Sequence, residues 1–121
     1  MNRQLVFETA YKRIRSQGGL SWNGNTEACY YRYLSRACAI GACVPDEAYD
    51  RKAEGCAIAF VPVGSAHPLV EMLDKSPILL GWREDKDFLN DLQKTHDNSG
   101  DEKVLEDLET FAKRYDLTVP G

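Results

Sequence analysis

Four cysteines are the residues of this chain with the widest range of possible chemistry. They are separated by eight, four and twelve residues, at positions Cys29, Cys38, Cys43 and Cys56. Four thiolates can close a tetrahedral zinc site, but zinc-binding turns present their ligands in pairs two to four residues apart. Only Cys38 and Cys43 approach that spacing, and they lie in an apolar run. We therefore expect packed core thiols and no cofactor, with a zinc site as the alternative.

Histidines that could serve a cysteine nucleophile are scarce. A catalytic thiol needs a lowered pKa and a histidine base within reach. His67 precedes Pro68 at the expected start of one helix, and His96 lies at the expected end of another, so capping or surface roles are predicted. The chain has no phosphate-binding glycine loop, serine nucleophile elbow or paired-histidine motif. We expect a non-enzymatic protein, and a small enzyme centred on the thiols remains an alternative.

Charge is unevenly distributed along the chain. Residues 1–36 carry six Lys or Arg against two Asp or Glu, a net charge of +4, whereas residues 37–121 carry −8. The acidic part repels phosphate but suits a partner with a basic surface. The candidate contacts to such a partner are Asp85, Asp87, Asp91, Asp101, Glu102 and Glu106.

Aromatic and basic residues occur together near the N-terminus, in the stretch CYYRYLSR at 29–36. Tyrosines beside arginines can stack on the bases of a nucleic acid if they share an exposed face. The candidate contacts for this alternative are Lys12, Arg13, Arg15, Tyr30 and Arg32. In a strand, Tyr30 and Arg32 would share one face and Tyr31 and Tyr33 the other.

Length and composition indicate one domain over residues 1–121. The chain is 43% hydrophobic and 28% charged, close to the average for globular proteins. No apolar run approaches the length of about 20 residues needed to cross a bilayer. The first residues, MNRQLVFETAYKR, carry charges where a secretion signal has its apolar stretch. We expect a cytoplasmic protein with no membrane contact.

Hydrophobic periodicity predicts four helices. The first covers 3–16, with Leu5, Val6, Thr9, Ala10 and Ile14 on its apolar side. The second starts near Ser65 and Pro68 and ends before Pro77. The third runs from Asp85 to His96, with Phe88, Leu89, Leu92, Gln93 and His96 at helical spacing. The last begins near Val104 with Asp101 as its cap. Its apolar stripe comprises Val104, Leu105, Leu108, Phe111, Ala112 and Tyr115.

Short strands are expected in the middle of the chain. Residues 28–34 are rich in tyrosine, and residues 56–61 form a second apolar run before Pro62. Between them, the run at 37–44 is expected to be buried, as a strand or a short helix, and its alanines favour the helix; Gly41 allows a close backbone approach and Pro45 redirects the chain. The predicted fold is α+β: one small, mostly helical domain with two or three short central strands.

Two motifs resemble a known group of proteins. They are the segment CAIG followed by VPDEAY, at 38–49, and the helix end LQKTHD at 92–97. The chain resembles small uncharacterised proteins encoded by bacteriophages and prophages, over most of its length apart from the region around Cys56. The resemblance implies a phage or prophage origin and no particular reaction.

A phage origin implies a class of function by analogy. Small acidic phage proteins without catalytic motifs often occupy the surface of a host protein, as inhibitors of CRISPR systems do. We therefore expect an interaction protein that binds and modulates a host or defence protein, in the first instance as an inhibitor. The first alternative is a small nucleic-acid-associated accessory protein, and the second is the zinc protein or enzyme.

Overall fold

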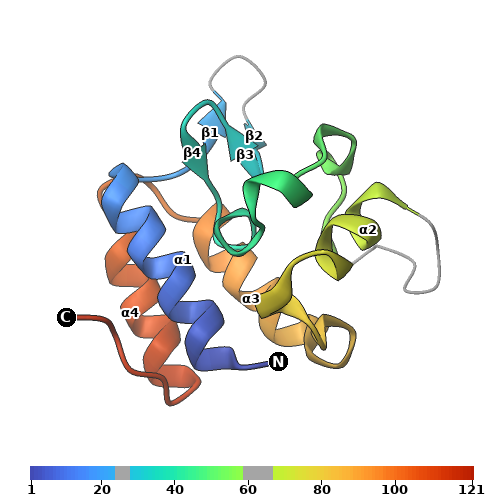
Figure 1. Cartoon of the computed structure of the whole chain (residues 1–121). Helices are drawn as coiled ribbons and strands as arrows, with labels where there is room; N and C mark the ends of the chain where they lie inside the picture. The colour runs from blue at the N-terminus through green and yellow to red at the C-terminus, as the bar shows by residue number, and fades with distance from the viewer. Residues whose placement is uncertain (24–27, 59–66) are drawn as a thin grey trace.

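A layer of helices carries two short β-hairpins at one end in the computed structural model (Figure 1). The structure describes residues 1–23, 28–58 and 67–121, and only the backbone at 22, 23, 28 and 29. Four helices and four two-residue strands lie in these ranges, which confirms a small, mostly helical α+β domain. None of the described helices has the length and apolar character needed to cross a bilayer.

The first helix, α1 (Arg3–Gln17), forms where the sequence predicts it. The Asn2 side chain caps it by accepting a hydrogen bond from Leu5 N at 3.0 Å, and Gly18 ends it in the left-handed conformation. The predicted apolar stripe is wrong in one respect, because Leu5 is 42% exposed. Aromatic side chains take its place in the core. The buried residues of α1 are Val6, Phe7, Ala10, Tyr11 and Ile14.

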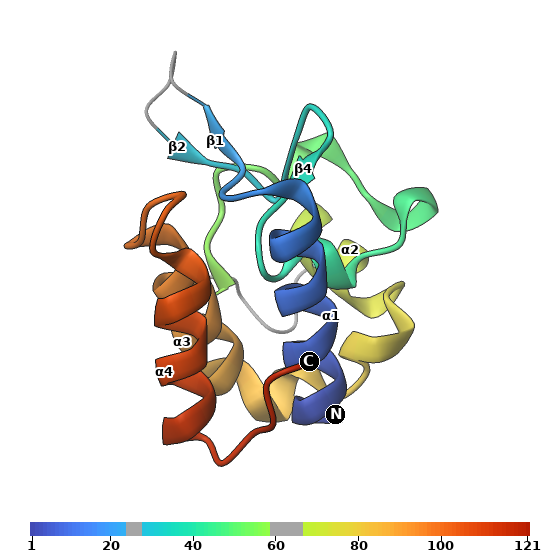
Figure 2. The same cartoon turned by 90° about the vertical axis from the view of Figure 1, so that its left-hand side faces the viewer.

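A helical hairpin of α3 (Lys86–Asp97) and α4 (Val104–Arg114) packs beside α1 (Figures 1 and 2). The predicted apolar stripes of both helices are confirmed. Phe88 and Phe111 meet in the middle, with ring centroids 5.5 Å apart, and Phe7 of α1 stacks on Phe111 at 6.0 Å. These rings bury large apolar surfaces where the three helices join, so they form the centre of the helical layer.

Arg3 fixes the start of α1 against the helical hairpin. Its Nε and NH2 donate to the two carboxylate oxygens of Asp85 at 3.0 and 2.6 Å. The guanidinium also lies over the rings of Phe88 and Tyr115, 4.9 and 5.6 Å from their centroids. A bidentate ion pair and two aromatic faces therefore orient this side chain.

The predicted strand over 28–34 is divided between two antiparallel hairpins. β1 (Trp22–Asn23) pairs with β2 (Ala28–Cys29), and β3 (Arg32–Tyr33) pairs with β4 (Arg36–Ala37). The prediction of a continuous strand at 28–34 is therefore wrong. The predicted alternation of its side chains between two faces is wrong for the same reason. The ring of Tyr30 packs edge-on against Tyr33 with centroids 5.5 Å apart, because the chain turns at Tyr31.

The apolar run at 37–44 is buried, as predicted, but its helix is a single 3₁₀ turn, η1 (Gly41–Cys43). Gly41 is required there, because a Cβ at this position would lie 1.9 Å from the carbonyl oxygen of Tyr31. The predicted close backbone approach is thus confirmed. Beyond Pro45 the chain forms two more 3₁₀ turns, η2 (Asp46–Ala48) and η3 (Arg51–Ala53).

The second predicted helix is α2 (Pro68–Asp74), with Pro68 in its first turn. The imidazole of His67 caps it, since Nδ1 accepts a hydrogen bond from Leu69 N at 3.0 Å. Two 3₁₀ turns, η5 (Pro77–Leu79) and η6 (Trp82–Asp85), lead to α3. Cys56, Ala57 and the buried Ile58 are not in a strand, and positions 59–61 of that predicted strand, together with Ser65, fall outside the described residues.

Asp101 does not cap the last helix, so this prediction is wrong. Lys103 occupies the cap position and makes no side-chain capping bond. The Oδ1 of Asp101 instead accepts a hydrogen bond from Leu20 N at 2.8 Å and lies 3.8 Å from the guanidinium of Arg36. The carboxylate therefore connects the loop before α4 to the chain just after α1.

Replacing Gly41 by alanine is expected to destabilise the fold, because the new methyl group would overlap the Tyr31 carbonyl oxygen. Overpacking of this kind lowers the free energy of unfolding by about 1 to 3 kcal/mol. Chemical denaturation of both proteins measures the difference. Gly100→Ala is the matched control, because nothing lies within 4 Å of a Cβ built there. Wild-type stability for Gly41→Ala would contradict the close approach.

Candidate functional site

A groove with a volume of about 620 Å³ opens beside the β3–β4 hairpin. We call it the tyrosine groove. Two stretches of chain form it, one around the hairpin and one at the turns η2 and η3. Its lining residues are Tyr30, Arg32, Tyr33, Leu34, Tyr49, Arg51, Glu54 and Gly55. Sequence reasoning identified Tyr30 and Arg32 and missed the others, since no local pattern connects the two stretches.

The carboxylate of Glu54 holds the two sides of the tyrosine groove together. Oε1 accepts a hydrogen bond from Tyr31 N at 2.9 Å, and Oε2 accepts from Arg32 N at 3.1 Å. The hydroxyl of Tyr49 donates to the same Oε2 at 2.7 Å. Burial, and then this hydrogen bond, raise the pKa of Tyr49 above its ordinary value. The hydrogen bond to Glu54 therefore fixes the orientation of the Tyr49 ring.

Arg32 is committed to contacts within the chain. Its Nε donates to Gly41 O at 3.1 Å, NH2 donates to Val44 O, and NH1 pairs with Asp46 Oδ1 at 2.5 Å. The hydrogen bond from Arg32 lowers the pKa of Asp46. The guanidinium also faces the ring of Tyr49, 5.8 Å from its centroid. Arg32 thus braces one wall of the groove, and most of its donors are used.

Leu34 projects from the tip of the β3–β4 hairpin and is 88% exposed. Its φ of 56° is in the left-handed region, which two-residue hairpin loops normally fill with glycine or asparagine. Arg13 of α1 supports the loop from below by donating to Ser35 O at 3.0 Å. The chain therefore presents a large apolar side chain to solvent in an unfavourable backbone conformation.

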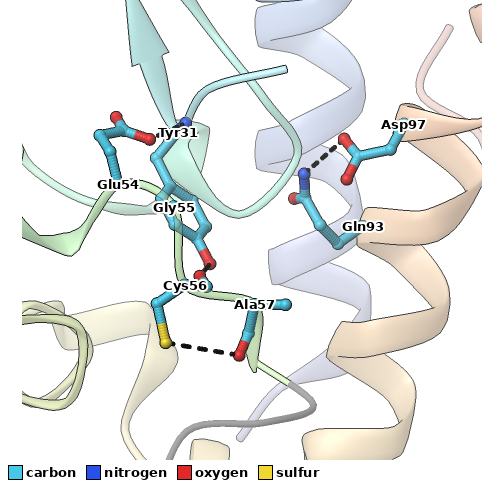
Figure 3. Close-up of a pocket in the computed structure, with 7 residues that line it drawn as sticks. All are labelled: Tyr31, Glu54, Gly55, Cys56, Ala57, Gln93 and Asp97. Atoms are coloured by element: carbon cyan, nitrogen blue, oxygen red, sulfur yellow. Dashed lines mark hydrogen bonds between the residues drawn. The ribbon is translucent and has the colours of Figure 1, made fainter. Parts of the chain in front are cut away.

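A smaller cavity of about 190 Å³ lies on the other side of Glu54. We call it the Cys56 pocket. Figure 3 shows Gln93 and Asp97 facing it from α3, opposite Tyr31 and Cys56. The hydroxyl of Tyr31 donates to Cys56 O at 2.7 Å, and Gln93 Nε2 donates to Asp97 Oδ1 at 2.8 Å. These hydrogen bonds link the segment after η3 to the hairpin and stabilise the helix end.

His96 is fully buried, so a surface position for it is wrong. Its Nδ1 lies 2.9 Å from Asp97 Oδ1, and its Nε2 has no partner among the described residues. The half-buried thiol of Cys56 interacts instead with Ala57 O, at 3.8 Å. Within the described part of the chain, no hydrogen bond joins Cys56 to an imidazole, which is the arrangement that thiol activation requires.

The thiols of Cys38 and Cys43 are packed in the core, as predicted. Cys38 Sγ accepts a hydrogen bond from Gly41 N at 3.3 Å, and Cys43 Sγ lies 3.6 Å from Ala39 O. Burial raises the pKa of both thiols, that of Cys43 to about 12. The side chain of Cys29 lies outside the described residues. In the described ranges, no three His, Cys, Asp or Glu residues gather as metal ligands.

The six predicted acidic contacts do not form one patch. Asp85 pairs with Arg3, Asp91 accepts a hydrogen bond from the Tyr115 hydroxyl, and Asp101 accepts one from Leu20 N. Of the six, Asp87, Asp101, Glu102 and Glu106 are exposed. Asp87 is in the first turn of α3, and Glu102 follows the end of this helix, which is about 18 Å long. The proposed binding role of these six acids therefore stays a prediction, and the six side chains do not share one surface.

The predicted basic contacts are separated as well. Arg13 reaches the β3–β4 loop, near Tyr30 and Arg32, whereas Arg15 donates to the carbonyls of Pro120 and Gly121 at 3.4 and 3.1 Å. Lys12 is exposed on α1. Only part of this set therefore lies beside the tyrosine groove, and Arg32 is paired there with Asp46.

Comparison of the chain with protein-family models, with curated proteins and with solved structures finds no match. The resemblance to phage-encoded proteins stays a prediction. The contacts around the tyrosine groove and the Cys56 pocket are therefore the basis for assigning a function.

Cys38→Ser is expected to lower the free energy of unfolding by about 1 to 3 kcal/mol, because a hydroxyl costs more to bury than a thiol in this largely apolar core. Cys43→Ser should act in the same direction, and neither change should alter the partner affinity of the folded protein. Cys56→Ser is the matched control, since this side chain is half-buried and should change stability by less than about 0.5 kcal/mol. Urea denaturation compares the three variants. Loss of affinity at unchanged stability would place the site at the core thiols.

Acid stability is expected to depend on Asp85. The hydrogen bond from Arg3 lowers the pKa of Asp85, so the unfolded chain takes up this proton at a higher pH than the folded chain. The contribution of the pair is complete above the ordinary pKa of the carboxyl and is lost as the pH falls through the folded value. Asp85→Asn should therefore flatten the loss of thermal stability between about pH 6 and pH 2.

Asp87→Asn is the control for losing one negative charge near the start of α3 without losing the Arg3 contact. Melting temperatures measured across the acid range compare it with wild type and with Asp85→Asn. An Asp85→Asn curve parallel to wild type would show that the ion pair makes no contribution.

Proposed function

We propose that this chain is a non-enzymatic interaction protein that binds and modulates another protein through the tyrosine groove and the tip of the β3–β4 hairpin. The exposed side chain of Leu34 is the observation that carries the proposal. It is held at φ 56° on a hairpin tip, where glycine would fold with less strain. Strain of this kind is characteristic of sites where a side chain must be displayed for function.

The composition of the groove supports protein binding. Tyrosine and arginine are enriched among the residues that dominate protein interfaces, because both combine a large contact area with polar ends. Three tyrosines and two arginines line the groove beside Leu34. Two of these five side chains, Tyr49 and Arg32, are already held by Glu54 and Asp46, so they need little further ordering on binding.

The charge of this surface does not favour nucleic-acid binding. Residues 46–54 carry four Asp or Glu and two Lys or Arg, a net charge of −2. Arg32 is neutralised by Asp46, which leaves few cations for a phosphate backbone. The groove therefore replaces the acidic helices as the preferred contact surface, and the nucleic-acid function becomes an outcome to be tested.

The kind of partner follows from the resemblance to phage and prophage proteins. On that basis the partner is a host or defence protein in the bacterial cytoplasm, and binding inhibits it. The source of this step is the analogy with small phage inhibitors, whereas the location of the contact surface rests on Leu34 and the tyrosine groove.

Leu34→Gly is expected to abolish partner binding without destabilising the protein. Glycine adopts positive φ without strain, so the melting temperature should be unchanged or higher, while the exposed apolar side chain is removed. Quantitative affinity capture from bacterial lysate, followed by mass spectrometry, compares wild type with the variant. A protein that is enriched by wild type and lost with Leu34→Gly identifies the partner.

Leu80→Ala is the matched control, because Leu80 is also a large exposed apolar residue, 61% exposed, and lies between η5 and η6. It should capture the same partner as wild type. Equal capture by all three proteins would exclude the hairpin tip as the contact. Binding of single-stranded DNA with a steep salt dependence, lost with Arg13→Ala, would favour the nucleic-acid function instead.

A further inference from the structure

We propose that the tyrosine groove takes an extended, proline-rich segment of the partner, with one carboxylate that pairs with Arg51. This inference rests on the proposed function and specifies the ligand chemistry of the same surface. It follows from which polar groups of the groove are already satisfied and which are open.

The carboxylate that lines the groove is already used. Glu54 receives three hydrogen bonds, from Tyr31 N, Arg32 N and the Tyr49 hydroxyl. A ligand that brings N–H donors to this part of the groove would compete with these contacts. The groove therefore disfavours a segment whose backbone donors need partners.

Two groups that can donate hydrogen bonds are open in the groove. The hydroxyl of Tyr33 and the guanidinium of Arg51 have no hydrogen-bond or ion-pair partner in the part of the chain that the structure describes, and both residues line the groove. Tyrosine ring faces surround them, with Tyr30 edge-on to Tyr33. The complementary ligand presents apolar rings and carbonyl acceptors and lacks backbone donors.

Proline-rich chains meet these requirements. Proline has no backbone N–H, and its ring packs well on an aromatic face. In the polyproline II conformation the carbonyls have no internal hydrogen bonds and are available to external donors. The conformation is formed before binding, so its ordering costs little. Aromatic grooves with hydroxyl donors are a recurring way of binding such segments.

Charge complementarity is the reason why we include one carboxylate in the proposed ligand. Arg51 is exposed, and its positive charge has no partner among the described residues. One negative charge on the ligand would pair with it. A phosphodiester chain would bring a charge with every nucleotide toward the acidic segment 46–54, whose net charge is −2. A single carboxylate beside prolines avoids this repulsion.

Fluorescence anisotropy with short labelled peptides tests the proposal. The probes are PPAPPAPE and EPPAPPAP, the same peptides with lysine in place of glutamate, and a glycine-serine peptide with one glutamate. Wild type should bind a glutamate-bearing proline peptide best and the glycine-serine peptide least. Tyr33→Ala should lose most of the binding, and Tyr33→Phe, which removes only the hydroxyl, should lose about fivefold.

Arg51→Glu should weaken binding of the glutamate peptide by about fivefold and improve binding of the lysine peptide by a similar factor. Lys52→Glu is the matched control, since it makes the same change in net charge at the neighbouring residue, which does not line the groove. It should preserve the preference for glutamate. Circular dichroism confirms that each variant is folded.

Three results would overturn the inference. The first is equal binding of proline and glycine-serine peptides, the second is an unchanged charge preference in Arg51→Glu, and the third is tighter binding of a single-stranded oligonucleotide. Lysate capture that still depends on Leu34 in those cases would leave the protein-binding function intact. Loss of that dependence would remove the proposed function as well.

Discussion

The carboxylate of Glu54 connects two parts of the chain that are far apart in the sequence, the start of the β3–β4 hairpin and the turns η2 and η3. It accepts hydrogen bonds from the backbone of the residues that begin β3 and from the hydroxyl of Tyr49, and it lines both the tyrosine groove and the Cys56 pocket. Backbone N–H groups at a hairpin start need acceptors, and a charged acceptor makes stronger bonds than a neutral one. The shape of both concave surfaces therefore depends on this side chain.

The helical layer supplies the support for that arrangement. Phe7, Phe88 and Phe111 bring α1 and the α3–α4 hairpin together, and Arg3 locks the start of α1 against Asp85. At the opposite end of α1, Arg13 reaches the loop of the β3–β4 hairpin. A rigid helical base thus presents a short hairpin whose two-residue strands would be unstable alone, because an isolated hairpin is at best marginally stable in water.

Pairing within the chain explains why charge pattern alone is a poor guide to the contact surface here. Asp85, Asp101 and Arg32 all stand out in the sequence as charged candidates, and all three make contacts inside the protein. Their charges fix the fold more than they attract a partner. Among the described residues that line the tyrosine groove, Leu34, Tyr33 and Arg51 keep side-chain surface or hydrogen-bonding groups available, and they are spread over two segments. The groups available to a partner are therefore those that make no contact within the protein.

The helices could be predicted from the sequence because their hydrogen bonds and apolar stripes are local, with a period that is visible within one window. The stripes of α3 and α4, the proline at the start of α2 and the glycine at the close approach to Tyr31 are of this kind. The groove was decided by tertiary structure. Its central contacts join Glu54 to Tyr31 and Arg32, which precede it in the sequence by 23 and 22 positions. The hairpin tip at Leu34 has no glycine or asparagine that would have indicated a turn. A periodic pattern cannot encode contacts over that separation, so only the folded chain determines which side chains share a surface.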